Sequence, residues 1–272
     1  MREDFIMNRL KEHYEFAKKT GHEIVFLALQ GSQNYGLDVY SDNYVSDIDT
    51  KAVILPSFED ICKNGEPVSK TLILPNNEHC DLKDIRVMFK CFEKQNVNFI
   101  EILFTKYIII NPDYEDFVKE LLSMNEEIAH INFNQALKCM AGMSKEKLKA
   151  MEHPYPNTEE KIKKYGYDPK QLHHILRMKD FIIKYINGRP YSECLIPENP
   201  EYLKEIKTKP IPLEEARELA KKTDKDTEML KALNLRLDSS VNKETLEKMS
   251  DLTYKMLKRY YKETLFLEDK DE

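Results

Sequence analysis

Two short stretches decide the expected fold: Gly31-Ser32-Gln33-Asn34-Tyr35-Gly36, and then Ser46-Asp47-Ile48-Asp49. Only 7 glycines occur among the 272 residues, yet two of them bracket the first stretch. The apolar run Glu23–Leu29 directly before it predicts a core strand that ends in a turn. A glycine at that point lets backbone N–H groups turn toward a ligand, and a serine hydroxyl adds a donor, as in phosphate-binding loops. A tight turn alone also requires glycine, so the stretch by itself is only weakly specific.

The second stretch places two carboxylates on one face of a strand. Val45–Leu55 alternates polar and apolar residues, becomes apolar and ends at Pro56, which predicts a strand. Side chains two apart share a face, with α-carbons about 6.6 Å apart, so Asp47 and Asp49 project together and Ile48 points to the core. Carboxylate oxygens are ligands for hard divalent cations. The alternative is an exposed sheet edge, where alternate acids are common.

A third carboxylate is expected from a neighbouring strand. Lys70–Leu74 and Glu78–Leu82 predict a hairpin around Pro75-Asn76-Asn77, and Asp81 lies within its second strand. Cross-strand neighbours bring side chains within about 5 Å, so Asp81 is the candidate third metal ligand. Asp84 is the competitor, but it is well placed to cap a helix whose apolar face includes Ile85 and Phe89.

The organisation of the chain changes near residue 130. An amphipathic helix over Phe5–Lys19 opens the first part, in which strands and helices alternate. Beyond it, strand signals almost vanish, and helices are predicted over Ile128–Met151, Pro169–Asn187, Pro212–Leu235 and Asn242–Leu265. The sequence therefore predicts an α/β (α+β) protein that divides near residue 130, with an α/β amino-terminal part at residues 1–130 and an all-helical part at residues 131–272.

These segments resemble a known superfamily. The Gly-Ser pair followed by an acid-x-acid strand is similar to the signature of the DNA polymerase beta-like nucleotidyltransferases. Two further segments resemble predicted bacterial and phage nucleotidyltransferases of the YcgL type: Lys94–Phe104, which ends in Glu-x-Leu-Phe, and Tyr165–Lys170 with His174 and Arg177. The interval between Gly36 and Asp47 is a few residues longer than the pattern.

The resemblance implies a mixed-sheet nucleotidyltransferase catalytic domain at residues 1–130, followed by an all-helical domain at residues 131–272 that binds substrate or nucleotide. It also implies transfer of a nucleoside monophosphate from an NTP, with ATP the expected donor, and release of pyrophosphate. Asp47, Asp49 and Asp81 would be the catalytic, metal-binding residues for Mg²⁺, with Mn²⁺ as the alternative ion, because in-line displacement at phosphorus needs charge neutralisation at both oxygens. Gly31 and Ser32 would position phosphates, and Tyr35 would also contact the nucleotide. The acceptor is left open: an RNA 3′ end, a protein hydroxyl or a small molecule.

Secondary candidates accompany this core set. Lys51 shares the face of the acid pair, where either a phosphate contact or a solvated lysine at the strand edge is expected. Glu101 lies in an apolar helical segment, so it contacts the site or forms an ion pair that holds the helix. Lys170, His174 and Arg177 lie at i, i+4 and i+7 of a predicted helix, on one face that can bind nucleotide. The basic and aromatic residues of 161–177 suit triphosphate and base contacts, or form an ordinary helix surface.

Composition excludes several classes of protein. Lys and Arg number 42 and Asp and Glu 48, a net charge of -6, so a polybasic nucleic-acid binder is excluded, although the lysine-rich segment keeps structured RNA open as a partner. The acidic N-terminus and the short apolar runs predict neither export nor a membrane span. The 5 scattered cysteines are expected as reduced thiols of a cytoplasmic protein. The functional alternative to the enzyme is a nucleotide-binding or toxin-antitoxin-like regulator without turnover.

Overall fold

The computed structural model describes residues 2–41, 44–237 and 240–268. The chain forms two compact units, and each is discontinuous in sequence. The sheet unit comprises Met1–Gly31, Asp47–Ile131 and Val241–Glu272, and the helical unit comprises Ser32–Ser46 and Asn132–Ser240. The predicted domain limits, 1–130 and 131–272, instead follow one continuous division, and they stay a prediction.

The sheet unit is built on a mixed sheet of order β5-β6-β4-β1-β7. Only β4 and β6 pair in parallel among the described strands of this sheet, and the other neighbours are antiparallel. The strands are β1 (Glu23–Gln30), β4 (Asp49–Leu55), β5 (Ser69–Ile73), β6 (His79–Asp84) and β7 (Ile108–Ile110). The adjacent strands β1 and β4 are buried on both faces, as strands covered by helices on each side are.

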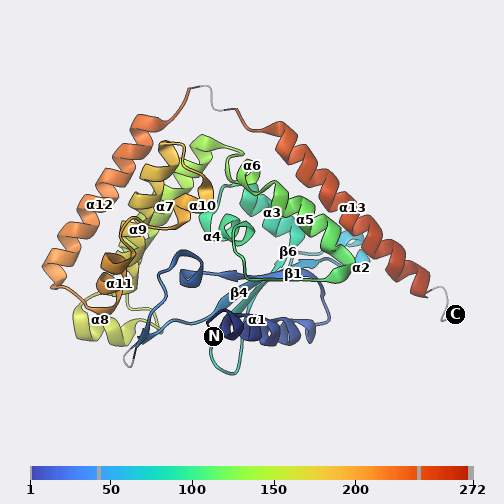
Figure 1. The fold of residues 1–272 in the computed structure, drawn as a ribbon, viewed down its shortest axis with the longest axis horizontal. Helices are drawn as coiled ribbons and strands as arrows, with labels where there is room; N and C mark the ends of the chain where they lie inside the picture. The colour runs from blue at the N-terminus through green and yellow to red at the C-terminus, as the bar shows by residue number, and fades with distance from the viewer. Residues whose placement is uncertain (1, 42–43, 238–239, 269–272) are drawn as a thin grey trace. The chain divides into compact units, whose positions relative to one another are not determined.

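Helices cover both faces of this sheet (Figure 1). The helix α1 (Arg2–Lys18) buries Ile6 and Leu10 against Leu27 and Ile54 of the sheet. On the opposite face, Val53 lies with Met88 and other apolar residues of three helices. Those helices are α3 (Ile85–Glu93), α5 (Glu115–Ser123) and α13 (Lys243–Glu268). The shorter elements of the unit are α2 (Phe58–Cys62), α4 (Val97–Ile100), η2 (Glu101–Leu103), η3 (Pro112–Tyr114) and α6 (Asn125–Ala129).

The helical unit is centred on α9 (Pro169–Ile186), which packs against the other long helices (Figure 1). Its partners are α7 (Phe133–Ala150), α10 (Tyr191–Leu195), α11 (Pro200–Thr208) and α12 (Leu213–Asn234). The unit also contains α8 (Glu159–Tyr165), the turn η1 (Ser32–Tyr35) and the two-stranded β2 (Tyr40–Ser41) and β3 (Tyr44–Val45). Large apolar side chains on several faces of α9, such as Leu172 and Phe181, are fully buried, which is why α9 occupies the centre.

The predicted fold class is confirmed: a mixed α/β sheet unit accompanies a helical unit. Several elements differ in detail. The strand predicted over Val45–Leu55 is interrupted, because β3 ends at Val45 and β4 begins only at Asp49. The helix predicted over Ile128–Met151 is two helices, since the side chain of Asn132 accepts from Gln135 N and starts a new one. The strand β7 was not predicted.

The last helix belongs to the sheet unit and not to the helical one. The guanidinium of Arg259 on α13 forms a two-pronged ion pair with Asp116 of α5, with N–O distances of 2.9 and 2.8 Å. Met256 of the same helix is buried beside Phe117 and Met88. The helical periodicity of the sequence predicts such a helix but not the apolar surface that receives it.

Candidate active site

The bend after β1 is made by Gly31, whose φ of +94° lies in the left-handed region. A Cβ atom at this position would meet no other atom within 4 Å, so the backbone conformation and not crowding requires glycine. The N–H of Gly31 donates to Oε1 of Glu101 at 3.1 Å. Glu101 is buried in η2 and so holds the bend from within the unit. The expectation that the Gly31 N–H turns toward a phosphate is therefore corrected, because Glu101 takes this donor.

The acid pair lies at the head of β4, beside this bend. Gln30 is the register partner of Asp49, which puts the end of β1 and the start of β4 at the same edge. Asp47 is exposed and precedes the strand, whereas Asp49 is half-buried and accepts from His79 N at 3.1 Å. Ile48 is buried with the α1 residues on the other face of the sheet. Asp47 and Asp49 thus flank a residue that anchors the segment in the core.

Asp81 lies on β6 directly opposite Lys51 of β4. The ammonium of Lys51 is 3.2 Å from Oδ2 of Asp81, donates to Gln30, and lies 4.7 Å from the centroid of the Phe99 ring. Lys51 is only 3% exposed, so the expectation of a solvated lysine at the strand edge was wrong. Burial raises the pKa of Asp81, but Lys51, Thr71 and Lys83 together outweigh burial and lower it below the usual value.

The fit of this site to a divalent cation rests on the acid pair. Asp47 and Asp49 supply the oxygen donors that Mg²⁺ prefers. Asp81 is engaged by Lys51 and by the hydroxyl of Thr71, so a lysine stands where a third ligand was expected. Across residues 2–41, 44–237 and 240–268, no three Asp, Glu, His or Cys side chains gather as a metal-binding group. The competitor Asp84 caps α3 by accepting from Arg86 N at 2.8 Å, as predicted.

A buried polar cluster behind the acid pair was missed by sequence reasoning. Glu78 accepts from the backbone N–H of Ile48 at 3.3 Å, between the two aspartates. The same carboxylate binds Arg9 at 2.6 Å and lies 3.0 Å from Nε2 of His13, which is fully buried. Nδ1 of His13 lies 2.9 Å from the hydroxyl of Thr50. No local motif marks these residues, because α1 and the β5–β6 hairpin meet only in the folded sheet unit.

The remaining predicted nucleotide contacts lie in the helical unit. Ser32 begins η1, and its carbonyl accepts from Leu37 N at 2.9 Å. The guanidinium of Arg177 lies 4.1 Å from the centroid of the Tyr35 ring, and both residues are buried. His174 is packed edge-on against His173 at 5.2 Å. Burial lowers the pKa of His174 well below its usual value, and His173, Arg177, Lys170 and Lys147 add to the effect.

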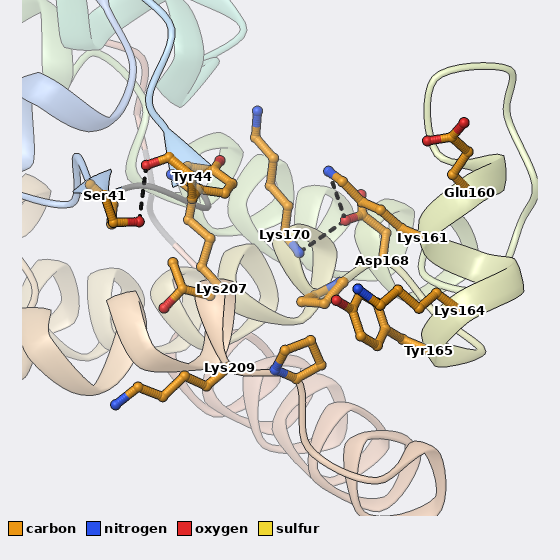
Figure 2. Close-up of a pocket in the computed structure, with 14 residues that line it drawn as sticks. Ser41, Tyr44, Glu160, Lys161, Lys164, Tyr165, Asp168, Lys170, Lys207 and Lys209 are labelled. Carbon is orange, nitrogen blue, oxygen red and sulfur yellow. Dashed lines mark hydrogen bonds and ion pairs between the residues drawn. The ribbon is translucent and has the colours of Figure 1, made fainter.

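Lys170 is separated from His174 and Arg177 by its surroundings. It lines a cavity of about 770 Å³ within the helical unit, and neither of the other two residues does (Figure 2). The i, i+4, i+7 spacing is real, but α9 is packed on several sides, so residues of one stripe meet different neighbours along its length. The prediction that the three residues share one ligand face stays a prediction.

Comparison with known proteins identifies the chain. Residues 3–179 match the model of the RNA repair pathway DNA polymerase beta family (RlaP). The chain belongs to this family. The match spans both the Gly-Ser and acid-x-acid stretches and the start of the helical unit, and it confirms the predicted DNA polymerase beta-like nucleotidyltransferase superfamily. The protein is therefore a nucleotidyltransferase.

Other comparisons are more distant. The chain is similar to a nucleotidyltransferase-like protein from Exiguobacterium sibiricum 255-15 of known crystal structure, with 14% identity and a TM-score of 0.29 over 83% of this chain and 74% of that one. No curated protein matches the chain. Among the helices that the structure describes, none combines the length and apolar character needed to span a bilayer.

Proposed function

We propose that this RlaP-family enzyme transfers a nucleoside monophosphate from an NTP, with ATP as donor, to the 3′ hydroxyl of an RNA. The observation that carries the proposal is the acid pair Asp47 and Asp49 at the head of β4, beside the Gly31 bend. The family description, which names an RNA repair pathway, supports RNA over a protein or a small molecule as the acceptor.

In this proposal Asp47 and Asp49 hold Mg²⁺, or Mn²⁺ as the alternative. The bound ion would supply charge neutralisation at the entering and leaving oxygens of phosphoryl transfer. Asp81 remains the third catalytic carboxylate, and its lowered pKa keeps it ionised at neutral pH, as either metal binding or acceptance of the hydroxyl proton requires. Asp81 can take either role only after Lys51 leaves it, since the two side chains are paired.

The phosphate and nucleotide contacts are reassigned by the same reasoning. Ser32 is the residue that we retain for the triphosphate, because Glu101 occupies the N–H of Gly31. Tyr35 and Arg177 stack on each other and are buried, so their proposed role is to fix the segment that follows Gly31. His174, which stays neutral at physiological pH because its pKa is lowered, supports α9 and does not supply positive charge.

The test is direct transfer of label. Incubation with α-³²P-labelled ATP, Mg²⁺ and an RNA oligonucleotide should lengthen the RNA by one nucleotide and release pyrophosphate, and an RNA ending in a 3′ phosphate should be inert. Asp49→Asn should lower the rate by about 100-fold or more, as loss of an electrostatic transition-state contact does. Asp251→Asn, which alters an exposed acid of α13, is the matched control. ATP binding by the wild type without transfer to RNA would overturn the proposal in favour of a regulator.

A further inference from the structure

The helical unit contains a cavity of about 770 Å³ that we call the lysine cavity (Figure 2). Its walls come from the β2–β3 pair, α8, the start of α9, the end of α11 and the segment that follows α11. The residues that bear on its chemistry are Tyr44, Lys161, Lys164, Tyr165, Lys170, Lys207 and Lys209, with the acids Glu160 and Asp168. A cavity of this volume is within the range of ordinary small-molecule sites and exceeds what a single phosphate group needs.

The charge of the lysine cavity is opposite to that of the whole chain. Its lining has five lysines and two acids, 5 minus 2 or +3, in a protein of net charge -6. One of the acids is already engaged, because Asp168 caps α9 through Lys170 N at 3.1 Å and lies 3.6 Å from the ammonium of Lys161. Concentrated positive charge of this kind is the electrostatic requirement for binding phosphates with release of counterions.

Aromatic rings accompany the lysines. The ammonium of Lys207 is 4.6 Å from the centroid of the Tyr44 ring and 3.4 Å from the hydroxyl of Ser46, although Lys207 is only 7% exposed. The ammonium of Lys164 is 5.0 Å from the centroid of the Tyr165 ring. Both tyrosines are half-buried and line the cavity. Lysines beside accessible rings form the pattern that binds single-stranded nucleic acid, with backbone phosphates on the cations and bases on the rings.

A phosphodiester chain suits this cavity better than the triphosphate of the donor. A donor NTP is bound together with its divalent ion, which requires carboxylates beside the phosphates. In the lysine cavity, Asp168 is committed to the helix cap and to Lys161, and Glu160 is the other acid of the lining. The lysines are also spread over three segments of the chain, as befits contacts to successive phosphates of a strand.

We propose that the lysine cavity binds the phosphodiester backbone of a single-stranded RNA acceptor. The inference rests on the proposed function, in which RNA is the acceptor, and it adds where the RNA is bound. Lys164, Lys170 and Lys209 provide the accessible phosphate contacts, while the buried Lys207 and the half-buried Tyr44 complete the lining.

Binding of a 5′-fluorescein-labelled single-stranded RNA, followed by anisotropy at several salt concentrations, tests this assignment. The triple variant Lys164→Gln/Lys170→Gln/Lys209→Gln should bind at least about tenfold more weakly, and the slope of log affinity against log salt should shrink by about 2, three contacts at about 0.7 each. The charge-preserving variant with arginine at the three positions should bind as the wild type does. Lys145→Gln/Lys222→Gln, which removes exposed lysines of α7 and α12 outside the cavity, is the control.

The outcomes separate the two proposals. Unchanged RNA binding by a folded triple variant overturns the lysine cavity as an RNA site. Loss of ATP binding with RNA binding unchanged also overturns it and makes the cavity a triphosphate site. If RNA binding depends on the three lysines but the wild type transfers no nucleotide, the site stands and only the proposed function fails.

Discussion

At the scale of single residues, Lys51 is the side chain whose environment departs most from sequence expectation. It joins three groups that the chain keeps far apart in sequence: Gln30 of β1, Asp81 of β6 and the ring of Phe99. A buried cation is tolerated only when anionic and polar partners repay its desolvation. Lys51 thereby holds three elements of the sheet unit together on the face that carries Asp49.

Replacing Lys51 by methionine should therefore destabilise the protein. It leaves Asp81 without its main counter-ion, and we expect a loss of about 2 kcal/mol in unfolding free energy, less than the cost typical of a fully buried pair because the Asp81 side chain stays 20% exposed. The double variant Lys51→Met/Asp81→Asn should recover part of this loss. Urea unfolding measures the unfolding free energies of the single and the double variant. The control is Lys70→Met on the exposed edge strand β5. A double variant less stable than the single one would show that the pair is not what stabilises this site.

At the scale of elements, the start of β4 is positioned by α1 and β6. Glu78 accepts from the N–H of Ile48 and is itself fixed by Arg9 and His13. This cluster also contacts Thr50, so Asp49, the preceding residue of β4, lies on the opposite face of the strand. A one-residue slip of β4 would exchange these faces and bury the aspartates. The cluster therefore fixes the register of β4 in addition to stabilising the sheet unit.

The variant Glu78→Gln should loosen this segment while the sheet persists. Amide hydrogen exchange of residues 47–50 should accelerate by about tenfold or more, since about 1.4 kcal/mol of local stability corresponds to one factor of ten. The rest of the sheet unit should be little affected, and transfer activity should fall through kcat. Glu66→Gln, which changes an exposed acid before β5, is the comparison. Faster exchange throughout the unit would mean that Glu78 serves general stability and not the acid segment.

At the scale of the whole molecule, two histidines of α9 make the stability of the helical unit depend on pH. The pKa of His173 is lowered to about 3 by burial and, to a lesser extent, by the positive charges of Arg177, Lys207 and Lys170. The hydrogen bond that its Nδ1 donates to Leu203 O, 2.9 Å away, opposes this shift. The pKa of His174 is also lowered, by burial and by its charged neighbours, which include Lys147 of α7. Both histidines of α9 therefore stay neutral in the folded helical unit at pH values at which the unfolded chain is protonated.

The free energy of unfolding of the helical unit should accordingly fall as the pH drops. A histidine whose folded pKa is depressed gives no pH dependence above about 6.5, the ordinary value, and below it His173 costs roughly 1.4 kcal/mol per pH unit as the unfolded state takes up the proton. His173→Gln should flatten this slope, although it weakens the unit at pH 7.5. Urea unfolding between pH 7.5 and 5 measures the slope of the unfolding free energy against pH. The control is His153→Gln, at an exposed position. Equal slopes in all three proteins would contradict the account.

Local sequence signals were sufficient for most of the long helices and for the bend after β1. Helical periodicity predicted α1, α9, α12 and α13, because side-chain spacing of 3.6 residues is a property of the chain alone. The glycine after an apolar run predicted the Gly31 bend, since its positive φ excludes most other residues. Alternation around Ile48 predicted that this residue is buried between two more accessible aspartates, because neighbouring extended residues point oppositely, and the structure has Ile48 buried. The metal-binding role of Asp47 and Asp49 stays a prediction.

Tertiary structure decided the partners. The contacts that define the site join residues far apart in the chain. They are the pair of Lys51 with Asp81, the hydrogen bond from the Gly31 amide to Glu101, the hydrogen bond from Ile48 N to Glu78, and the lysines around the cavity. No periodicity or spacing encodes such pairs, because burial and charge compensation depend on which surfaces meet when the sheet and helices pack. The same limit explains why α13, clear as a helix in the sequence, could not be assigned to the sheet unit until its apolar and charged contacts with α5 were known.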